Sequence, residues 1–236
     1  MSTFTIIVPI FNEKDNLSRL ESELMKFINS TKFKTKALLI NDGSTDGSKD
    51  IIEKLCNDNS CFESISFVRN YGLSSALKAG FDLCNSEYIG YIDADLQTSP
   101  SDFHVLLKFI DNYDLVTGYR SNRKDSYLKN ISSLVANGIR HIFTGDGVKD
   151  TGCPLKVIRT DFAQKIPMFK GLHRFLPAMI LLQKGKIIEV PVQHFPRIAG
   201  KTKFGLFNRI LGPLYDCFAF IWMKRKYINY QIEDNE

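Results

Sequence analysis

The feature that most constrains this chain is a regular alternation of short apolar runs and helical segments over its first 118 residues. The run Phe4–Ile10 is apolar and β-branched, as a buried strand requires, and apolar residues then recur at helical spacing up to Asn29, with Asn12 as the expected cap. The same order predicts further strands at Ala37–Ile40, Ile65–Val68, Tyr88–Ile92 and Leu115–Thr117, and helices at Lys49–Cys56, Leu73–Cys84 and Ser101–Ile110. This alternation predicts an α/β fold with a mostly parallel sheet that is covered by helices on both faces.

The second half of the chain is less regular. Helical spacing predicts helices at Tyr127–Phe143, His173–Gln183 and Leu206–Met223, the last followed directly by Lys224-Arg225-Lys226. Strands are expected at Leu155–Ile158 and Ile187–Val192, and Pro191 places the second of these near a sheet edge. The basic, glycine-containing segment Arg197–Lys203 is expected to be a loop.

Length and composition suit one α/β domain, alone or with an appendage. The chain has 236 residues, 44% hydrophobic and 24% charged, which is ordinary for a soluble globular protein. It contains no apolar run of the roughly 18 residues that a membrane-spanning helix needs, and no secretory signal is expected at its start. The 5 cysteines lack a C-x-x-C pair, which favours reduced thiols in a cytosolic protein.

Charge is distributed unevenly along the chain. Residues 1–118 carry 11 Lys and Arg against 17 Asp and Glu, whereas residues 119–236 carry 20 against 9. The basic half is suited to phosphates, nucleic acid or an anionic membrane, and it is equally typical of a solvated basic face. No helix-turn-helix, RNA-recognition or zinc pattern is present, so we do not expect nucleic acid as a partner.

The sequence Asp93-Ala94-Asp95 follows a predicted buried strand. Two carboxylates in one turn repel each other unless a cation lies between them, and hard oxygen ligands favour Mg²⁺ or Mn²⁺. Gln97 would add a carbonyl oxygen. The same pattern is also typical of a polar turn with solvated acids.

Two further polar clusters follow predicted strands. In Asn41-Asp42-Gly43-Ser44-Thr45-Asp46-Gly47-Ser48, Asp42 is placed to accept hydrogen bonds from a base or ribose, although such a cluster also caps helices. It spells neither the dinucleotide-binding nor the P-loop motif, which disfavours both classes. In Val8-Pro9-Ile10-Phe11-Asn12-Glu13, Phe11 is suited to stacking on a base, and a strand end with a helix cap explains the segment equally well.

The ordered set of motifs resembles family 2 glycosyltransferases of GT-A fold, and within them the dolichyl- or polyprenyl-phosphate sugar synthases. The set consists of V-P-I-F-N-E, N-D-G-S-T-D-G-S, R-N-Y-G-L-S-S-A, D-A-D-L-Q, V-T-G-Y-R-S-N-R, D-T-G-C-P-L-K and R-I-A-G-K-T-K-F-G. The resemblance runs from about Thr5 to Lys226. It implies inverting transfer of a sugar, such as mannose, glucose or an amino sugar, from a UDP- or GDP-sugar to a polyprenyl phosphate.

The resemblance also implies a role for particular residues. Those expected to hold the nucleotide sugar are Pro9, Phe11, Glu13, Asp42, Arg69, Gly72, Asp93 and Arg120. Those expected to bind Mg²⁺ or Mn²⁺ are Asp93, Asp95 and Gln97. Those expected at the acceptor phosphate are Arg123, Arg197, Thr202 and Lys203, and the catalytic group comprises Asp95, Asp150, Arg123 and Lys203. An ionised acceptor phosphate needs no strong general base, in keeping with the lack of an evident catalytic histidine.

A lipid acceptor requires the enzyme to dock on a membrane. We expect a catalytic domain over residues 1–204 and a membrane-proximal amphipathic helix and tail over 205–236, on the cytoplasmic face of the membrane. Trp222 and the basic triplet suit an interfacial position, although the helix is also suited to packing on the catalytic domain. Two alternatives stay open: a soluble or glycan acceptor, and a non-catalytic nucleotide-sugar-binding subunit.

Overall fold

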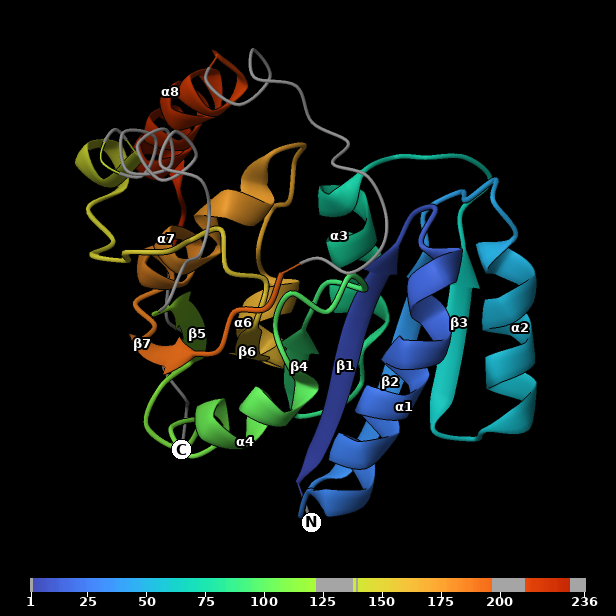
Figure 1. The fold of residues 1–236 in the computed structure, drawn as a ribbon. Coiled ribbons are helices and arrows are strands. Elements are labelled where there is room, and N and C mark those ends of the chain that lie inside the picture. The colour runs from blue at the N-terminus through green and yellow to red at the C-terminus, as the bar shows by residue number, and fades with distance from the viewer. Residues whose placement is uncertain (1, 122–137, 139, 197–210, 230–236) are drawn as a thin grey trace, which may run out of the picture.

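The computed structural model describes residues 2–121, 138, 140–196 and 211–229. These residues form one seven-stranded sheet with the order β3-β2-β1-β4-β6-β5-β7 (Figure 1). Its strands are β1 (Thr3–Ile10), β2 (Lys34–Asn41), β3 (Phe62–Ser66), β4 (Tyr88–Tyr91), β5 (Leu115–Arg120), β6 (Lys156–Arg159) and β7 (Ile187–Val192). Only β6 runs antiparallel to its neighbours β4 and β5, so the mostly parallel sheet predicted from the sequence is confirmed.

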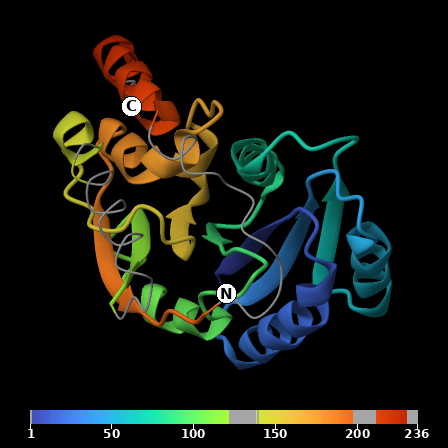
Figure 2. The ribbon, with the colours of Figure 1, turned by 45° about the horizontal axis from the view of Figure 1, so that its top comes forward.

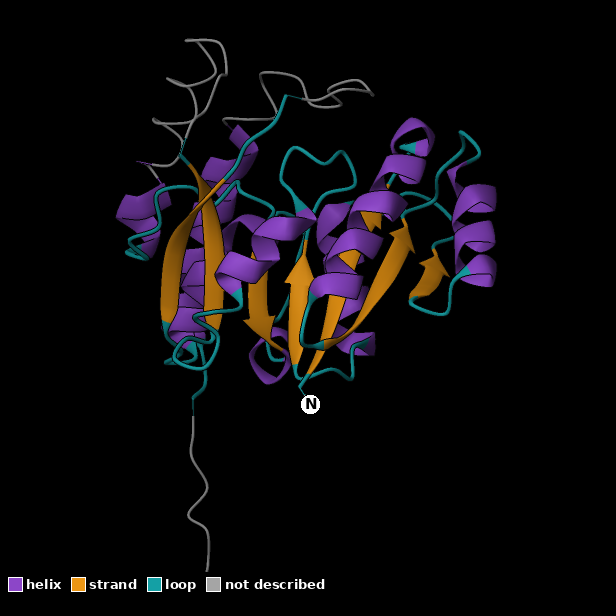
Figure 3. Cartoon of the chain, turned by 60° about the horizontal axis from the view of Figure 1, so that its bottom comes forward, coloured by secondary structure: helices purple, strands orange, loops and turns teal. Residues whose placement is uncertain are grey.

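Helices cover both faces of this sheet (Figure 2 and Figure 3). Those whose bounds are described are α1 (Lys14–Ser30), α2 (Ser48–Asp58), α3 (Leu73–Leu83), α4 (Phe103–Leu106), α6 (Thr160–Gln164), α7 (Leu176–Leu182) and α8 (Leu211–Lys226), with short 3₁₀ turns η1 (Pro100–Asp102) and η2 (Leu172–Phe175). Successive side chains of a strand point to opposite faces: Ile6 and Val8 pack in a core cluster with α1, α2 and α4, and Ile7 packs in a second cluster with α3, α6, α7 and α8.

Several predicted boundaries differ from those observed. The third strand is Phe62–Ser66 rather than Ile65–Val68, and Val68 is exposed in the loop that follows. The helix expected at Ser101–Ile110 is reduced to η1 and α4, and the one expected at His173–Gln183 is divided into η2 and α7. Pro177 at the start of α7 explains the division, because proline is favoured in the first turn of a helix.

Two other sequence predictions have a clear outcome. Asn12 does not cap α1, because it adopts a positive φ of 52° and its side chain accepts a hydrogen bond from the Thr45 amide at 2.8 Å. Pro191 does lie in an edge strand, since β7 ends the sheet order. The five cysteines are free thiols, as predicted. Most of the helix expected at Tyr127–Phe143 lies outside the described residues, and residues 140–144 are helical.

The last described helix, α8, packs its inner side on the second core cluster. Cys217 and Phe220 are buried there, and the Phe220 ring stacks on Phe175 at 5.5 Å. The helix continues through Lys226, so the basic triplet is its last turn rather than a segment after it. Positive charges at this position interact favourably with the negative end of the helix dipole. No helix among the described residues is long and apolar enough to cross a membrane.

Candidate functional site

The loops that follow β1, β2, β3 and β4 meet at the carboxyl edge of the sheet, as predicted. The amides of Asn12 and Glu13 donate to the hydroxyls of Ser44 and Ser48 at 3.0 and 3.1 Å, so the loops after β1 and β2 are bonded to each other. Parallel strands bring their carboxyl ends to one edge, which is where open α/β sheets bind ligands. Pro9 lies near the end of β1, and Phe11 and Glu13 follow it with partly exposed side chains at this edge.

Asp42 is buried, and its carboxylate organises the neighbouring loop. It accepts hydrogen bonds from the amides of Tyr71 and Gly72 at 2.7 and 2.8 Å and from the side-chain amide of Asn70 at 2.8 Å. The Arg69 guanidinium lies over the exposed Tyr71 ring at 5.0 Å. Asp42, Arg69 and Gly72, which are predicted to bind the nucleotide sugar, are therefore neighbours. A base-binding role for Asp42 stays a prediction, since these contacts show a role in folding the loop.

The carboxylates of Asp93 and Asp95 lie in a tight turn directly after β4. The Leu96 amide donates to the Asp93 carbonyl at 3.4 Å, and the Gln97 amide donates to the Asp95 carboxylate at 3.2 Å. Leu96 holds a positive φ of 52°, which is strained for a branched side chain, and that side chain is buried in the core. Core packing therefore fixes the conformation that presents the two acids.

The environment of this turn favours a bound cation. Burial raises the pKa of Asp93 to about 6 and the charge of Asp95 adds to the rise, while the hydrogen bond from Tyr91 and the charges of Lys156 and Arg120 oppose it. The Tyr91 hydroxyl donates to Asp93 at 2.8 Å. A divalent cation between the carboxylates would remove their repulsion.

The donor set fits Mg²⁺ or Mn²⁺ bound together with a substrate. Among the described residues, no group of three or more His, Cys, Asp or Glu side chains is placed to hold a metal ion. Magnesium sites commonly use one or two carboxylates and complete their coordination with water and substrate phosphates, so a pair of acids at a ligand-binding edge is sufficient.

Arg120, which is partly buried, and the buried Asp150 form an ion pair beside this turn. The Asp150 carboxylate accepts from Arg120 Nε at 2.7 Å and from Nη2 at 2.8 Å, a two-point contact with planar geometry. The structure thus joins two residues that the resemblance placed in different groups, Arg120 among the nucleotide-sugar residues and Asp150 among the catalytic ones. The predicted acceptor-phosphate residues Arg123, Arg197, Thr202 and Lys203 lie outside the described residues.

Three residues that support these groups were not predicted from the sequence: Tyr91, Lys156 and Glu189. The Tyr91 hydroxyl donates a hydrogen bond to Asp93, and Lys156 is buried close to the charges of Asp93 and Asp150. The Glu189 carboxylate accepts hydrogen bonds from the amides of Lys149 and Asp150 at 2.9 and 3.1 Å. A lysine within an apolar strand segment was the available signal for Lys156, because lysine is almost never fully buried unless it is paired.

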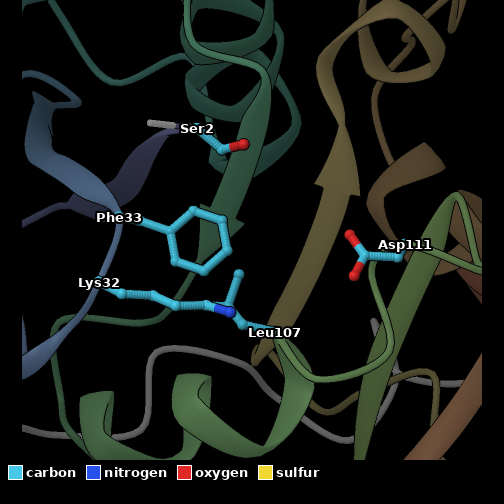
Figure 4. Close-up of a pocket in the computed structure, with 5 residues that line it drawn as sticks. All are labelled: Ser2, Lys32, Phe33, Leu107 and Asp111. Atoms are coloured by element: carbon cyan, nitrogen blue, oxygen red, sulfur yellow. The ribbon is translucent and has the colours of Figure 1, made fainter.

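Two surface cavities lie away from this site. One of about 240 Å³, at the edge where β1 and β2 begin (Figure 4), is lined by Ser2, Lys32, Phe33, Leu107 and Asp111. The other, of about 390 Å³, lies where β4 begins and β6 ends and is lined by Ser86, Glu87, Tyr88, Arg159, Thr160 and Asp161. Both are at the amino edge of the parallel strands, opposite the polar loops.

Residues 5–166 match glycosyl transferase family 2, and the chain belongs to this family. It is 30% identical over 214 residues to the undecaprenyl-phosphate 4-deoxy-4-formamido-L-arabinose transferase of Edwardsiella ictaluri, covering 90% of this chain and 66% of that protein. It is 29% identical over 227 residues to the dodecaprenyl-phosphate galacturonate synthase of Rhizobium johnstonii, covering 94% of this chain and 67% of that protein. The chain therefore spans about two thirds of the length of these relatives.

Solved structures confirm the predicted GT-A fold. Glucosyl-3-phosphoglycerate synthase from Mycobacterium tuberculosis, in complex with Mn²⁺, UDP and glucosyl-3-phosphoglycerate, superposes with a TM-score of 0.73 at 13% identity, over 97% of this chain and 81% of that one. Mannosyl-3-phosphoglycerate synthase from Rubrobacter xylanophilus gives 0.68 at 12% identity, over 100% and 79%. At these identities the likeness concerns the fold.

Proposed function

We propose that this chain transfers a sugar from a nucleoside diphosphate sugar, with UDP or GDP as the nucleotide, to a polyprenyl phosphate such as undecaprenyl or dolichyl phosphate. The observation that carries the proposal is the Asp93–Asp95 turn beside the Arg120–Asp150 pair at the carboxyl edge of a family 2 fold. Two relatives that match nine tenths or more of this chain are polyprenyl-phosphate sugar transferases by name.

The residues of the site have complementary roles in this reaction. The end of β1 and the loops at this edge would hold the nucleotide through Pro9, Phe11, Glu13, Asp42, Arg69 and Gly72. Asp93 and Asp95, with Gln97, would hold Mg²⁺ or Mn²⁺, which stabilises the negative charge of the departing diphosphate. Asp150 would face the sugar, and its contact fixes the orientation of the Arg120 guanidinium near the diphosphate.

The acceptor chemistry needs positive charge more than a base. A phosphate monoester is largely ionised near pH 7, so its oxygen attacks the anomeric carbon directly and the nucleoside diphosphate leaves from the opposite face, which inverts the configuration. Two anionic substrates must approach each other, and Arg123, Arg197, Thr202 and Lys203 are proposed to bind the acceptor phosphate.

We further propose that α8 docks on the cytoplasmic face of the membrane, where the acceptor lies. Tyr215, Phe218 and Trp222 are spaced three and four residues apart on its outer side, and their side chains are 77%, 57% and 67% exposed. Exposed aromatic side chains beside a basic helix end are typical of an interfacial position at an anionic lipid surface. The helix carries apolar residues on both sides, because its inner side packs on the core as well.

A transfer assay tests the proposal. The purified chain is incubated with labelled UDP- and GDP-sugars, Mn²⁺ and vesicles containing undecaprenyl or dolichyl phosphate, and lipid-linked sugar is extracted and counted. Asp95→Asn, which we expect to be inactive, and a sample with EDTA in place of Mn²⁺ serve as controls. We expect metal-dependent label in the lipid fraction, and transfer to soluble acceptors alone would show that the acceptor class is wrong.

A further inference from the structure

The turn at residues 149–153, which carries Asp150, is held through its main chain from two sides. On one side the Lys156 ammonium donates to the carbonyl of Thr151 at 3.3 Å and to the carbonyl of Cys153. On the other side the Glu189 carboxylate accepts the amides of Lys149 and Asp150. The positively charged Lys156 side chain thus donates hydrogen bonds to carbonyls of the turn, and the negatively charged Glu189 side chain accepts hydrogen bonds from its amides.

The two charged residues lie in one row across the sheet. Lys156 on β6 is paired with Tyr91 on β4 and with Thr117 on β5, and Thr117 is paired with Glu189 on β7. Paired residues point to the same face of a sheet, so Tyr91, Lys156, Thr117 and Glu189 form a continuous line beneath the site. The Lys156 ammonium also lies 5.9 Å from the centre of the Tyr91 ring, whose hydroxyl holds Asp93.

The burial of Lys156 is costly without such partners. Its side chain is 1% exposed, and burial lowers the pKa of its ammonium, while the negative charges of Asp150 and Asp93 act in the opposite direction. An apolar residue of similar length would fill the space without this cost. The contacts explain the lysine: it satisfies two carbonyls of the turn and places positive charge behind both acidic groups.

We propose that Lys156 and Glu189 are positioning residues, which clamp the 149–153 turn by its main chain and so hold the Asp150–Arg120 pair in place against the bound donor. The proposal rests on the proposed function only for what the pair acts on. The clamp itself is defined by the contacts above. Neither residue is expected to contact the substrate.

Hydrogen exchange of the turn tests the clamp without any substrate. Glu189 bonds the two amides with separate carboxylate oxygens, and Glu189→Gln keeps only one accepting oxygen, so one of these two bonds is lost. Lys156→Met removes both bonds from the ammonium to the carbonyls of Thr151 and Cys153. We expect exchange within residues 149–153 to accelerate about 10- to 100-fold in both variants, because hydrogen bonds to charged groups are the strong ones. Val157→Ala, an equally buried change on the opposite face of β6, and Lys186→Met, at an exposed lysine directly before β7, serve as controls.

Steady-state kinetics test what the clamp is for. We expect both variants to lower kcat about 10- to 100-fold, as misplaced catalytic groups do, and to leave the KM for the nucleotide sugar little changed. Lys156→Arg keeps charged N–H donors for the two carbonyls, so we expect this variant to retain most of the kcat that Lys156→Met loses. A role limited to general stability would not predict this difference. The double variant should lose less than the product of the single losses, since both residues act on one turn.

The outcomes separate the two proposals. Unchanged exchange in both variants overturns the clamp, and faster exchange with unchanged kcat overturns its role in positioning the Asp150–Arg120 pair. Equal losses in Val157→Ala and Lys156→Met at matched thermal stability also overturn it, because the effect would then be general. If the wild-type chain transfers no sugar to polyprenyl phosphate, the proposed function fails, while hydrogen exchange still decides whether the turn is clamped.

Discussion

Replacing Asp93 with asparagine should stabilise the metal-free protein while it removes a metal ligand. Burial and the neighbouring Asp95 raise the pKa of Asp93 from 3.8 to about 6, so the ionised group opposes folding. The sign follows from proton binding: between these two pKa values the folded state binds more protons than the unfolded state, and stability is lost as pH rises through this window. A difference of about two pK units corresponds to roughly 3 kcal/mol above pH 6.

Asparagine removes this penalty and keeps an oxygen that can accept from the Tyr91 hydroxyl, which donates to Asp93 at 2.8 Å. In EDTA, we expect Asp93→Asn to exceed the wild type by about 2–3 kcal/mol in free energy of unfolding at pH 8, and by only about 0.5 kcal/mol at pH 4. Urea denaturation followed by circular dichroism measures both values. Adding Mn²⁺ should stabilise the wild type more than the variant, because only the wild type has both carboxylates.

A particular result would refute this reasoning. If Asp93→Asn is no more stable than the wild type at pH 8 in EDTA, the carboxylate is not under the strain that its surroundings indicate. A stability gain that is the same at pH 4 and pH 8 would also be inconsistent with it, because a gain that does not depend on pH cannot arise from ionisation. Ser101→Ala serves as the control, because Ser101 is an exposed residue of η1 that does not ionise, so its replacement should not change how stability depends on pH.

Three further outcomes are expected. Asp95→Asn should abolish turnover with added Mn²⁺ while circular dichroism stays native, and near-normal rates would remove its metal role. Binding to anionic vesicles should weaken with added salt and when Lys224–Lys226 are replaced with glutamine, because each cation contributes about 1 kcal/mol near such a surface. Trp222→Ala should weaken binding further. Vesicle flotation in which binding does not depend on salt or lipid charge would contradict this prediction. Lys203→Ala should lower kcat/KM about 10²- to 10³-fold. Lys201→Ala, in the same basic segment but not among the residues expected at the acceptor phosphate, should have only a mild effect. If both variants keep normal kcat/KM, the acceptor phosphate is bound by other residues.

Much of the fold could be predicted because the spacing of apolar residues distinguishes strands from helices locally, and the order of these elements is read directly along the chain. The strand–helix alternation of residues 4–118 predicted the parallel part of the sheet, and the position of Pro191 predicted an edge strand. Boundaries failed where local chemistry competed with packing. At Val68 the apolar pattern continued, but pairing with β2 ended at Ser66, and the valine remained exposed in the loop.

The candidate site was predictable to the extent that its residues follow strands. Asp42, Asp93 and Asp95 come directly after apolar strand segments, and parallel topology brings such positions together. Asn12 shows the limit of this argument, since its residue type suits a helix cap, whereas its neighbours in the folded chain give it a bond to Thr45 instead.

The sequence alone determined the class of fold, the family and the acidic residues at the sheet edge, because these depend on residue type, spacing and order. Only the tertiary structure decided which charges face each other: that Asp150 binds Arg120, that Asp42 folds the loop at Tyr71, and that Lys156 and Glu189 hold one turn from two sides. The contacts of Asp150, Asp42 and Glu189 join residues that are 29 to 40 positions apart in the chain. The contacts of Lys156 and Glu189 depend on antiparallel β6, which is inserted between β4 and β5 and aligns Lys156 with Tyr91 and, through Thr117, with Glu189, a register that local sequence does not encode.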